Sequence, residues 1–398
     1  MDPRINPYAP GAGTPPPELA GRDELIERAA IALDRIRAGR AARSMILHGL
    51  RGVGKTVLLN RIEIDAEARG FASVTIEAPE ERSLPALLIP VLRLALLRLD
   101  RSKRIRASLA RAGRALAGFA NTLKVKYRDI EVSTDFEPER GLADSGDLDT
   151  DLTDLLTSVG RAAHEYRTAV TLFIDELQYV REDQLAALIR ALHSASQRQL
   201  PITMLAAGLP QLIGLIGRAK SYAERLFELV PIDRLDDNAA RTALCVPAKK
   251  EGVTFVPEAI AEILHNTMGY PYFLQEWGRH AWNVAKASPI SRADARHATT
   301  LALAELDAGF FRMRFNRLTP TEKEYLRAMA ELGPGPHRSG EIAQQLERGV
   351  TSVAPTRNEL IAKGMLYSPA HGDTAFTVPL FDGFMKRIMP ELNERQPK

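Results

Sequence analysis

The residues with the clearest chemical pattern are those at 49–56, Gly-Leu-Arg-Gly-Val-Gly-Lys-Thr. Their spacing matches G-x-x-x-x-G-K-[ST], in which backbone N–H groups surround phosphates and the following helix N-terminus adds positive potential. In that arrangement Lys55 reaches the β- and γ-phosphates and Thr56 is a ligand of Mg²⁺. The stretch therefore predicts a site for ATP and Mg²⁺. The residues that we expect to bind the nucleotide here are Gly49, Gly52, Gly54, Lys55, Thr56 and Val57.

A second pattern of the same kind follows at 171–176, where the apolar run Thr-Leu-Phe-Ile ends in two acids. Asp175 is placed to hold the metal ion through its water, and Glu176 is placed to polarise an attacking water. Because Glu176 offers a general base, the sequence favours hydrolysis over binding alone. The expected catalytic residues of the chain itself are thus Lys55 and Glu176.

The elements that must position these residues alternate between strand and helix. A short apolar strand precedes the loop and a helix follows it, and this order repeats toward residue 208. Such alternation is typical of a parallel α/β sheet with helices on its faces. The expected strands are 45–49, 71–76, 171–175 and 201–208, and the expected helices include 22–38, 57–70, 84–119 and 181–198.

Beyond Pro231 the strand pattern stops, and helical segments over 236–311 indicate a small helical lid. A third unit begins near Leu318, where Thr319 and Glu322 form a capping box around Pro320. Its order of three helices and a hairpin is that of a winged helix-turn-helix. The expected domains are a flexible proline-rich N-terminus (1–17), the nucleotide-binding α/β domain (18–230), the lid (231–311) and the winged helix (318–390).

The loop, the acids at 175–176 and the following helical domain together resemble an AAA+ P-loop ATPase. Residues 15–33, PPPELAGRDELIERAAIAL, are similar to the segment that lines the adenine pocket in the origin-recognition, initiator-type branch and its bacterial relatives. The resemblance implies that Leu19 and Arg22 contact the base region. An ordinary helix start, with Asp23 and Glu24 at the positive end of the dipole, is the alternative reading.

Two departures from the AAA+ pattern stand out. Where the family has a polar sensor after the fourth strand, this chain has Ala206, Ala207 and Gly208. Where it has an arginine after the lid glycine, this chain has no arginine before Arg279. A lid without an arginine directly after its glycine is similar to that of the signal-transducing branch of the superfamily.

Arg225 is placed like the arginine finger of the family, which completes the site of a neighbouring copy and stabilises transition-state charge. The resemblance thus implies a third catalytic residue and a homo-oligomer. A surface arginine between Glu224 and Glu228 remains the alternative.

The C-terminal unit suggests duplex DNA as a partner, because winged helices place their third helix against DNA. The candidates for DNA contact are Thr356, Arg357, Lys363 and, at the wing tip, His371. Glu347 and Glu359 would repel phosphates, so tight sequence-specific binding is not implied. Docking of a protein partner at the winged helix stays open beside DNA contact.

The bulk composition sets wide limits on the rest. The chain has 398 residues, a formal net charge of +3 and one cysteine, which excludes an internal disulfide framework and favours a reducing cytoplasm. Its most apolar stretch is interrupted by Pro85, Pro90 and Arg93, so we expect no membrane span. Basic residues gather at 98–114, as a solvated helix face or as a surface for an acidic partner.

The sequence as a whole predicts an ATP-hydrolysing conformational switch that engages duplex DNA. The alternative is a slowly hydrolysing signalling or defence-type switch whose winged helix docks a protein. A small-molecule kinase is disfavoured, because nothing after the sheet resembles an acceptor site.

Overall fold

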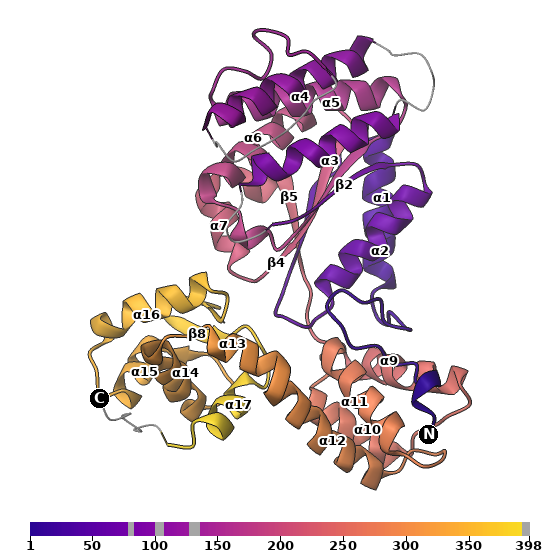
Figure 1. Cartoon of the computed structure of the whole chain (residues 1–398), viewed down its shortest axis with the longest axis vertical. Coiled ribbons are helices and arrows are strands. Elements are labelled where there is room, and N and C mark those ends of the chain that lie inside the picture. The colour runs from indigo at the N-terminus through magenta and orange to yellow at the C-terminus, as the bar shows by residue number, and fades with distance from the viewer. Residues whose placement is uncertain (79–82, 100–106, 127–135, 392–398) are drawn as a thin grey trace.

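The computed structural model describes residues 1–78, 83–99, 107–126 and 136–391 (Figure 1). In these ranges a five-stranded sheet has the order β2-β3-β4-β1-β5, and every described pairing in it is parallel. The prediction of a parallel α/β sheet is therefore confirmed. The strands are β1 (Ser44–His48), β2 (Ala72–Glu77), β3 (Val170–Asp175), β4 (Ile202–Gly208) and β5 (Phe227–Pro231).

Helices cover both faces of this sheet because side chains alternate along each strand. Met45 and Leu47 of β1 pack with the helices on one face, while Ile46 belongs to the core on the other. On the first face lie α1 (Asp23–Arg37) and α2 (Lys55–Ala68). On the second lie α3 (Leu84–Leu99), α4 (Ala107–Lys126), α5 (Leu148–Glu165), α6 (Glu182–Gln197) and α7 (Leu212–Ala219).

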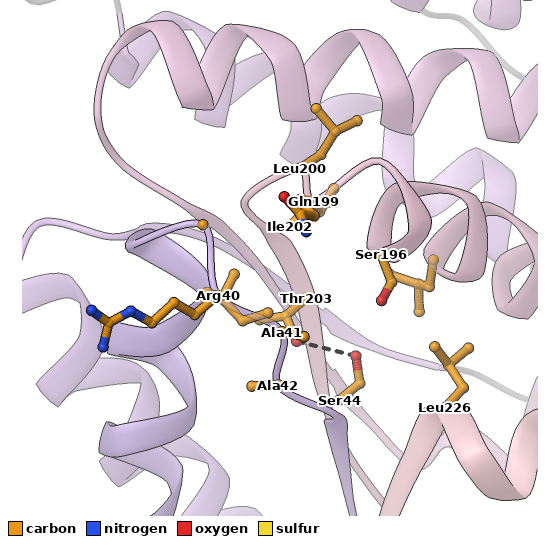
Figure 2. Close-up of a pocket in the computed structure, with 13 residues that line it drawn as sticks. Arg40, Ala41, Ala42, Ser44, Ser196, Gln199, Leu200, Ile202, Thr203 and Leu226 are labelled. Carbon is orange, nitrogen blue, oxygen red and sulfur yellow. Dashed lines mark hydrogen bonds between the residues drawn. The ribbon is translucent and has the colours of Figure 1, made fainter.

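The amino edge of the sheet is a separate surface from the edge that carries the loop. A hollow at this edge is lined by Arg40, Ser44, Gln199, Thr203 and Leu226, among others (Figure 2). The Ser44 and Thr203 hydroxyls are hydrogen-bonded at 3.1 Å, which joins β1 to β4 there. The loop at 49–56 follows the carboxyl end of β1, so this hollow is not part of the predicted nucleotide site.

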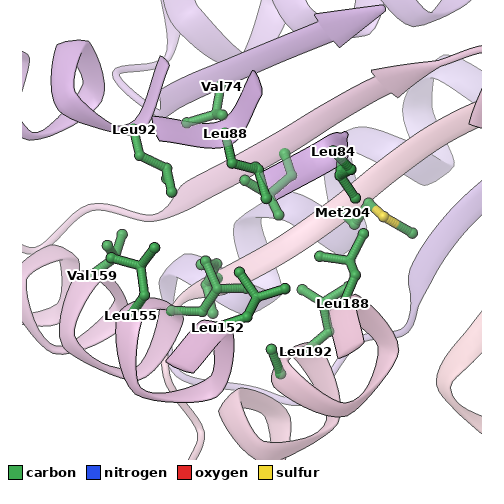
Figure 3. Close-up of a cluster of buried hydrophobic side chains, with 14 of the residues drawn as sticks. Val74, Leu84, Leu88, Leu92, Leu152, Leu155, Val159, Leu188, Leu192 and Met204 are labelled. Carbon is green, nitrogen blue, oxygen red and sulfur yellow. The ribbon is translucent and has the colours of Figure 1, made fainter. Parts of the chain in front are cut away.

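The core on the second face is built from leucines of three helices and the strands beneath them (Figure 3). Leu88 of α3, Leu155 of α5 and Leu188 of α6 are fully buried against Val74 and Met204. Burial of such side chains contributes about 1.5–3 kcal/mol each. This core holds β3 and β4 in register and so positions the acids at the end of β3.

The sequence reading missed one strand. No further strand of this sheet was expected after residue 208, whereas β5 follows the single helical turn α8 (Ala223–Leu226) and pairs with β1 at the edge of the sheet. This strand is short and ends in Pro231, so local propensity is a weak indication of it. Pairing with β1 decides its conformation.

A helical segment and the short link 317–319 join the helical region to the C-terminal unit. The helix α12 (Arg292–Leu306) continues through the π-helical turn η3 (Asp307–Phe311) into α13 (Arg312–Asn316). Buried residues from both parts, such as Trp277 and Phe384, belong to one cluster. The remaining helices of the first part are α9 (Asp237–Lys250), α10 (Pro257–Thr267) and α11 (Pro271–Val284).

The C-terminal unit has the expected three helices and hairpin, and its small antiparallel sheet is consistent with a winged helix. The predicted capping box of Thr319 and Glu322 is present at the start of its first helix. One short strand and a last helix, both absent from the sequence reading, complete it. The elements are α14 (Pro320–Leu332), β6 (His337–Arg338), α15 (Ser339–Gln345), α16 (Val350–Ala362), β7 (Leu366–Tyr367), β8 (Asp373–Phe376) and α17 (Phe381–Ile388).

The N-terminal segment, for which flexibility is expected over residues 1–17, contacts the helical region in the structure. Tyr8 is buried, and its hydroxyl donates to the carbonyl of Leu244 in α9. The indole N–H of Trp282 in α11 donates to the carbonyl of Asp2 at 2.9 Å. The only regular element of this segment is the short 3-10 helix η1 (Pro3–Ile5), and the aromatic ring of Tyr8 fills a gap between helices.

Part of the basic stretch at 98–114 lies outside the described residues, namely Arg101, Lys103, Arg104 and Arg106. Within the described part, Arg98 pairs with Glu67 at 3.3 Å and Arg114 pairs with Glu139 at 2.8 Å. These ion pairs agree with a solvated helix face. In the same described ranges every helix is too short or too polar to span a bilayer.

Candidate nucleotide site

The loop between β1 and α2 has the backbone that its glycines allow. Gly52 and Gly54 have φ angles of 82° and 88°, in the left-handed region that residues with a Cβ rarely adopt. A Cβ at Gly49 would lie 2.0 Å from the carbonyl oxygen of Ile232. The helix α2 begins at Lys55, two residues before the expected start, so the loop ends at the N-terminus of a helix.

Lys55 is buried inside this loop. Its Nζ donates to the carbonyl oxygens of Gly49 and Leu50 at 3.0 and 2.8 Å. Burial lowers the pKa of Lys55 to about 8, although Glu176 and Asp175 act in the opposite direction. The ammonium group contacts neutral carbonyls here, and a phosphate would be a stronger partner for it.

Thr56 and Asp175 lie together beside the loop. The Thr56 hydroxyl donates to the carboxylate Oδ2 of Asp175 at 2.6 Å. Burial raises the pKa of Asp175, while the hydrogen bond from Thr56 and that from the Glu176 N–H lower it. A hydroxyl and a carboxylate are hard oxygen ligands of the kind that Mg²⁺ prefers, so this pair fits the expected ion.

Glu176 lies next to the same group with a left-handed backbone, φ 53°. Its carboxylate is 3.5 Å from the guanidinium of Arg51 and accepts a hydrogen bond from the side-chain amide of Gln178. Both contacts hold the carboxylate near the loop, where a general base for water must be. A non-glycine residue with positive φ is uncommon and is found more often at functional sites.

Gln178 is a polar residue of the site that sequence reasoning missed. Its side-chain oxygen accepts the N–H of Leu209, directly after β4, at 3.0 Å. A Cβ at Gly208 would lie 2.7 Å from that oxygen. The space in which the family has a polar side chain on the fourth strand is thus filled by Gln178, coming from the loop after β3.

The residues expected at the base region have structural partners. Arg22 occupies the N-cap position of α1, and its guanidinium donates to the carbonyl of Asp233 and, at 3.5 Å, to that of Val53. Leu19 packs at the margin of the core beneath α1, and Val57 is half-buried in the first turn of α2. Arg22 therefore links the start of the domain to the phosphate loop and to the segment after β5.

Arg225 is exposed on α8, at the amino edge of the sheet. The loop at 49–56 is at the opposite, carboxyl edge, so the structure does not bring Arg225 to the site of its own chain. Arg225 could therefore contact a nucleotide only at the site of a neighbouring copy.

The C-terminal unit contacts the phosphate loop directly. The backbone N–H of Arg51 donates to the carbonyl of Thr377 at 3.0 Å. A Cβ at Gly364 would lie 3.2 Å from both the Arg51 guanidinium and the Tyr179 hydroxyl. From the helical region, the Tyr272 N–H donates to the carbonyl of Gly52 at 3.2 Å. All three parts of the chain therefore meet at residues 51–52.

Two of the DNA-contact candidates are engaged within the C-terminal unit. Arg357 donates to the hydroxyl of Thr374 at 2.8 Å, and Lys363 donates to both carboxylate oxygens of the buried Glu322 at 2.8 Å. Thr356 is half-buried and His371 is exposed. Within their own domain, Lys363 thus forms an ion pair and Arg357 forms hydrogen bonds with the hairpin.

Arg279, the first arginine after the lid glycine, is also committed elsewhere. Its guanidinium is 2.8 Å from Glu276 and 2.7 Å from Glu305, and His280 is 3.0 Å from Glu305. The acids and the histidine could surround a metal ion, but the guanidinium already supplies their counter-charge.

Comparison with known proteins agrees with this geometry. Residues 18–205 match the family profile described as an AAA ATPase domain, and residues 308–385 match a domain of unknown function. A search of curated proteins finds no match. Among solved structures, the Walker-type ATPase PABY2304 of Pyrococcus abyssi is similar with a TM-score of 0.58 and 15% identity, over 92% of this chain and 96% of that chain.

Two further structures show weaker similarity over similar lengths. The Orc1 protein of Aeropyrum pernix, solved in complex with DNA, has a TM-score of 0.48 and 15% identity, over 93% of each chain. Cdc6p of Pyrobaculum aerophilum has a TM-score of 0.49 and 15% identity, over 99% of each chain. The profile match and the geometry of the loop lead to one conclusion: residues 18–205 of this chain are an AAA ATPase domain.

Proposed function

We propose that this protein binds ATP with Mg²⁺ at residues 49–56, hydrolyses it, and uses the bound nucleotide to set the position of its C-terminal unit. The observation that carries the proposal is the contact of Arg51 with Thr377, since it joins the phosphate loop to that unit. The functional units that we propose are the ATPase domain (18–230), the lid (231–311) and the winged helix (318–390).

The chemistry divides among the residues of the loop and of β3. Lys55 holds the β- and γ-phosphates, and the amides of the loop surround them. Thr56 and Asp175 hold Mg²⁺, which supplies charge neutralisation at the phosphates when it is bound. Glu176 accepts a proton from the attacking water, and Gln178 and Arg51 keep its carboxylate in place.

The coupling follows from the contacts at residues 51–52. A nucleotide that reorients the backbone of the loop moves the N–H of Arg51, which donates to Thr377, and the carbonyl of Gly52, which accepts from Tyr272. The C-terminal unit then shifts relative to the sheet, and hydrolysis restores the first position.

Small-angle X-ray scattering and limited proteolysis with ADP, with a non-hydrolysable ATP analogue and without nucleotide test this coupling. We expect the analogue to change both the scattering curve and the cleavage pattern, and we expect Lys55→Ala to remove the change. Identical curves and patterns in all three states would contradict the coupling.

Contact with duplex DNA is proposed on the winged-helix form of the C-terminal unit and on the positions of Thr356 and His371. A second candidate function is docking of a protein partner by the same unit. The ion pair of Lys363 with Glu322 favours it, because the carboxylate offsets positive charge on the surface that would meet phosphates. Electrophoretic shift of the full chain with duplex DNA at low salt distinguishes the two. We further propose that Arg225 acts in trans in a homo-oligomer.

A further inference from the structure

Arg314 is a half-buried cation at the junction of all three parts of the chain. It lies on α13, immediately after the π-helical turn η3. Its Nη1 donates to the carbonyl of Phe310 at 2.6 Å, and its guanidinium lies 3.9 Å from the centroid of the Phe310 ring. Within the part of the chain that the structure describes, no carboxylate pairs with it or acts on its charge.

A series of contacts places Arg314 beside the phosphate loop. The Phe310 ring stacks on the Tyr272 ring, with centroids 5.1 Å apart and planes inclined by 26°. Tyr272 in turn donates its backbone N–H to Gly52 of the loop. The charge of Arg51 in the loop contributes to lowering the pKa of Arg314.

This environment is unfavourable for a cation in the absence of an anion. Burial, and after it the charge of Arg51, lowers the pKa of Arg314 to about 10, so the side chain is still charged at neutral pH. A partly buried charge without a counter-ion is unfavourable, because no attraction offsets the loss of its hydration. Arg279 on the neighbouring helix α11 shows the contrast, since two carboxylates neutralise it.

We propose that Arg314 contacts the terminal phosphate of the nucleotide bound at residues 49–56 of the same chain, beside Arg51. A guanidinium fits phosphate oxygens with two parallel hydrogen bonds, and the phosphate supplies the counter-charge that the protein lacks there. This inference rests on the proposed function. It adds the residue through which the third phosphate, absent from ADP, holds α13 and hence the C-terminal unit against the loop.

The π-helical turn before α13 gives the contact a means to adjust. Single π-helical turns inside α-helices are rare and are frequent at functional sites. Here the turn contains Phe310, whose ring and carbonyl both contact Arg314. A small change in η3 therefore moves the guanidinium toward or away from the loop.

The test compares ADP with a non-hydrolysable ATP analogue by fluorescence titration of the full chain with Mg²⁺. We expect Arg314→Ala to lower the affinity for the analogue about 10- to 100-fold, as loss of charge-assisted hydrogen bonds does. The affinity for ADP should stay within about twofold of the wild-type value. Arg314→Lys should recover part of the loss. Arg312→Ala, an exposed arginine on the same helix, is the matched control and should change neither affinity.

The outcomes separate this inference from the proposed function. If Arg314→Ala lowers the affinity for ADP and for the analogue equally, or lowers neither, the inference is overturned. Binding by the wild type would still support the proposed function in that case. A wild-type protein that binds neither nucleotide would overturn both. A purely structural role for Arg314, through Phe310 and the end of α13, predicts a lower melting temperature with unchanged discrimination between the nucleotides.

Discussion

The backbone N–H of Arg51, in the middle of the phosphate loop, is hydrogen-bonded at 3.0 Å to the carbonyl of Thr377, in the C-terminal unit. More than three hundred residues separate the two in sequence, so the contact forms only when the whole chain is folded. It makes the C-terminal unit a direct neighbour of the loop that we propose to hold ATP. The predictions below follow from this arrangement and from the groups around it.

Nucleotide affinity should depend on pH through Lys55. Phosphates need the ammonium form, and the pKa of Lys55 in the free protein is lowered to about 8. Affinity for ATP should therefore be constant below pH 7 and fall about tenfold per unit above pH 8, until the pKa of the bound state is reached. Titration calorimetry between pH 6 and about 9.5 measures this.

The same pKa shift determines the direction in which the stability of the folded state changes with pH. Since the pKa of Lys55 is lower in the folded than in the unfolded chain, the unfolded chain binds more protons between about 8 and the ordinary 10.5. This group alone therefore makes the folded state more stable as pH rises across that window. In Lys55→Arg any remaining ATP binding should be independent of pH, and a decline in that variant would assign the effect to another group.

Glu176→Gln should separate hydrolysis from binding. Removal of a general base lowers kcat by about 10²- to 10⁴-fold, whereas the amide keeps the size of the side chain and leaves ATP affinity nearly unchanged. Gln178→Ala should lower kcat less, because it removes only one of the two contacts that hold the carboxylate. Steady-state phosphate release and nucleotide titration of the three proteins give both quantities. Unaltered turnover in Glu176→Gln would exclude it as the base.

Gly364→Val should loosen the C-terminal unit from the ATPase domain. Its Cβ would lie within 3.2 Å of Leu209, Arg51 and Tyr179, in a backbone with φ 66°. Gly372→Val is the matched control, since Gly372 also has positive φ, 82°, but has open space around a Cβ. We expect a larger radius of gyration by small-angle scattering in the first variant only. An equal effect of both would mean that backbone strain, and not the contact, is responsible.

Tyr8→Ala should destabilise the helical region by about 3–5 kcal/mol, the usual cost of removing a buried aromatic ring. Tyr8 is 4% exposed, and its ring fills the space beside Gly278 of α11. Ile5→Ala changes an apolar side chain that is 53% exposed in the same segment, and it should cost little. Thermal unfolding followed by circular dichroism tests the pair. Similar melting temperatures for both variants would show that residues 1–17 do not stabilise the fold.

The ATPase motifs could be predicted because each is contiguous. The residues from Gly49 to Thr56 carry their own backbone requirements, and the acids after β3 are placed by the apolar run before them. The strands β1, β3 and β4 were predicted within one residue at each end for the same reason. The local sequence pattern was sufficient to predict those elements whose geometry depends on the spacing of neighbouring residues.

The other features of the site depend on tertiary contacts that no local pattern shows. Gln178 is a residue of the site only because Gly208 leaves room for it on the next strand. Arg314 lies beside Phe310, whose ring stacks on Tyr272, only because α12 runs through η3 into α13. Similarly, β5 forms by pairing with β1, and the ring of Tyr8 in the N-terminal segment fills a gap beside Gly278, which lies far along the chain.

The central claim is that residues 49–56 hold ATP with Mg²⁺, and binding of ATP by the wild type and by Lys55→Ala measures it most directly. Titration calorimetry with and without Mg²⁺ should show one site in the wild type that requires the ion for full affinity. The affinity of Lys55→Ala should be at least about 100-fold weaker, since the variant loses the charged contact with the phosphates. Equal, Mg²⁺-independent binding by the two proteins, or no binding by either, would contradict the account.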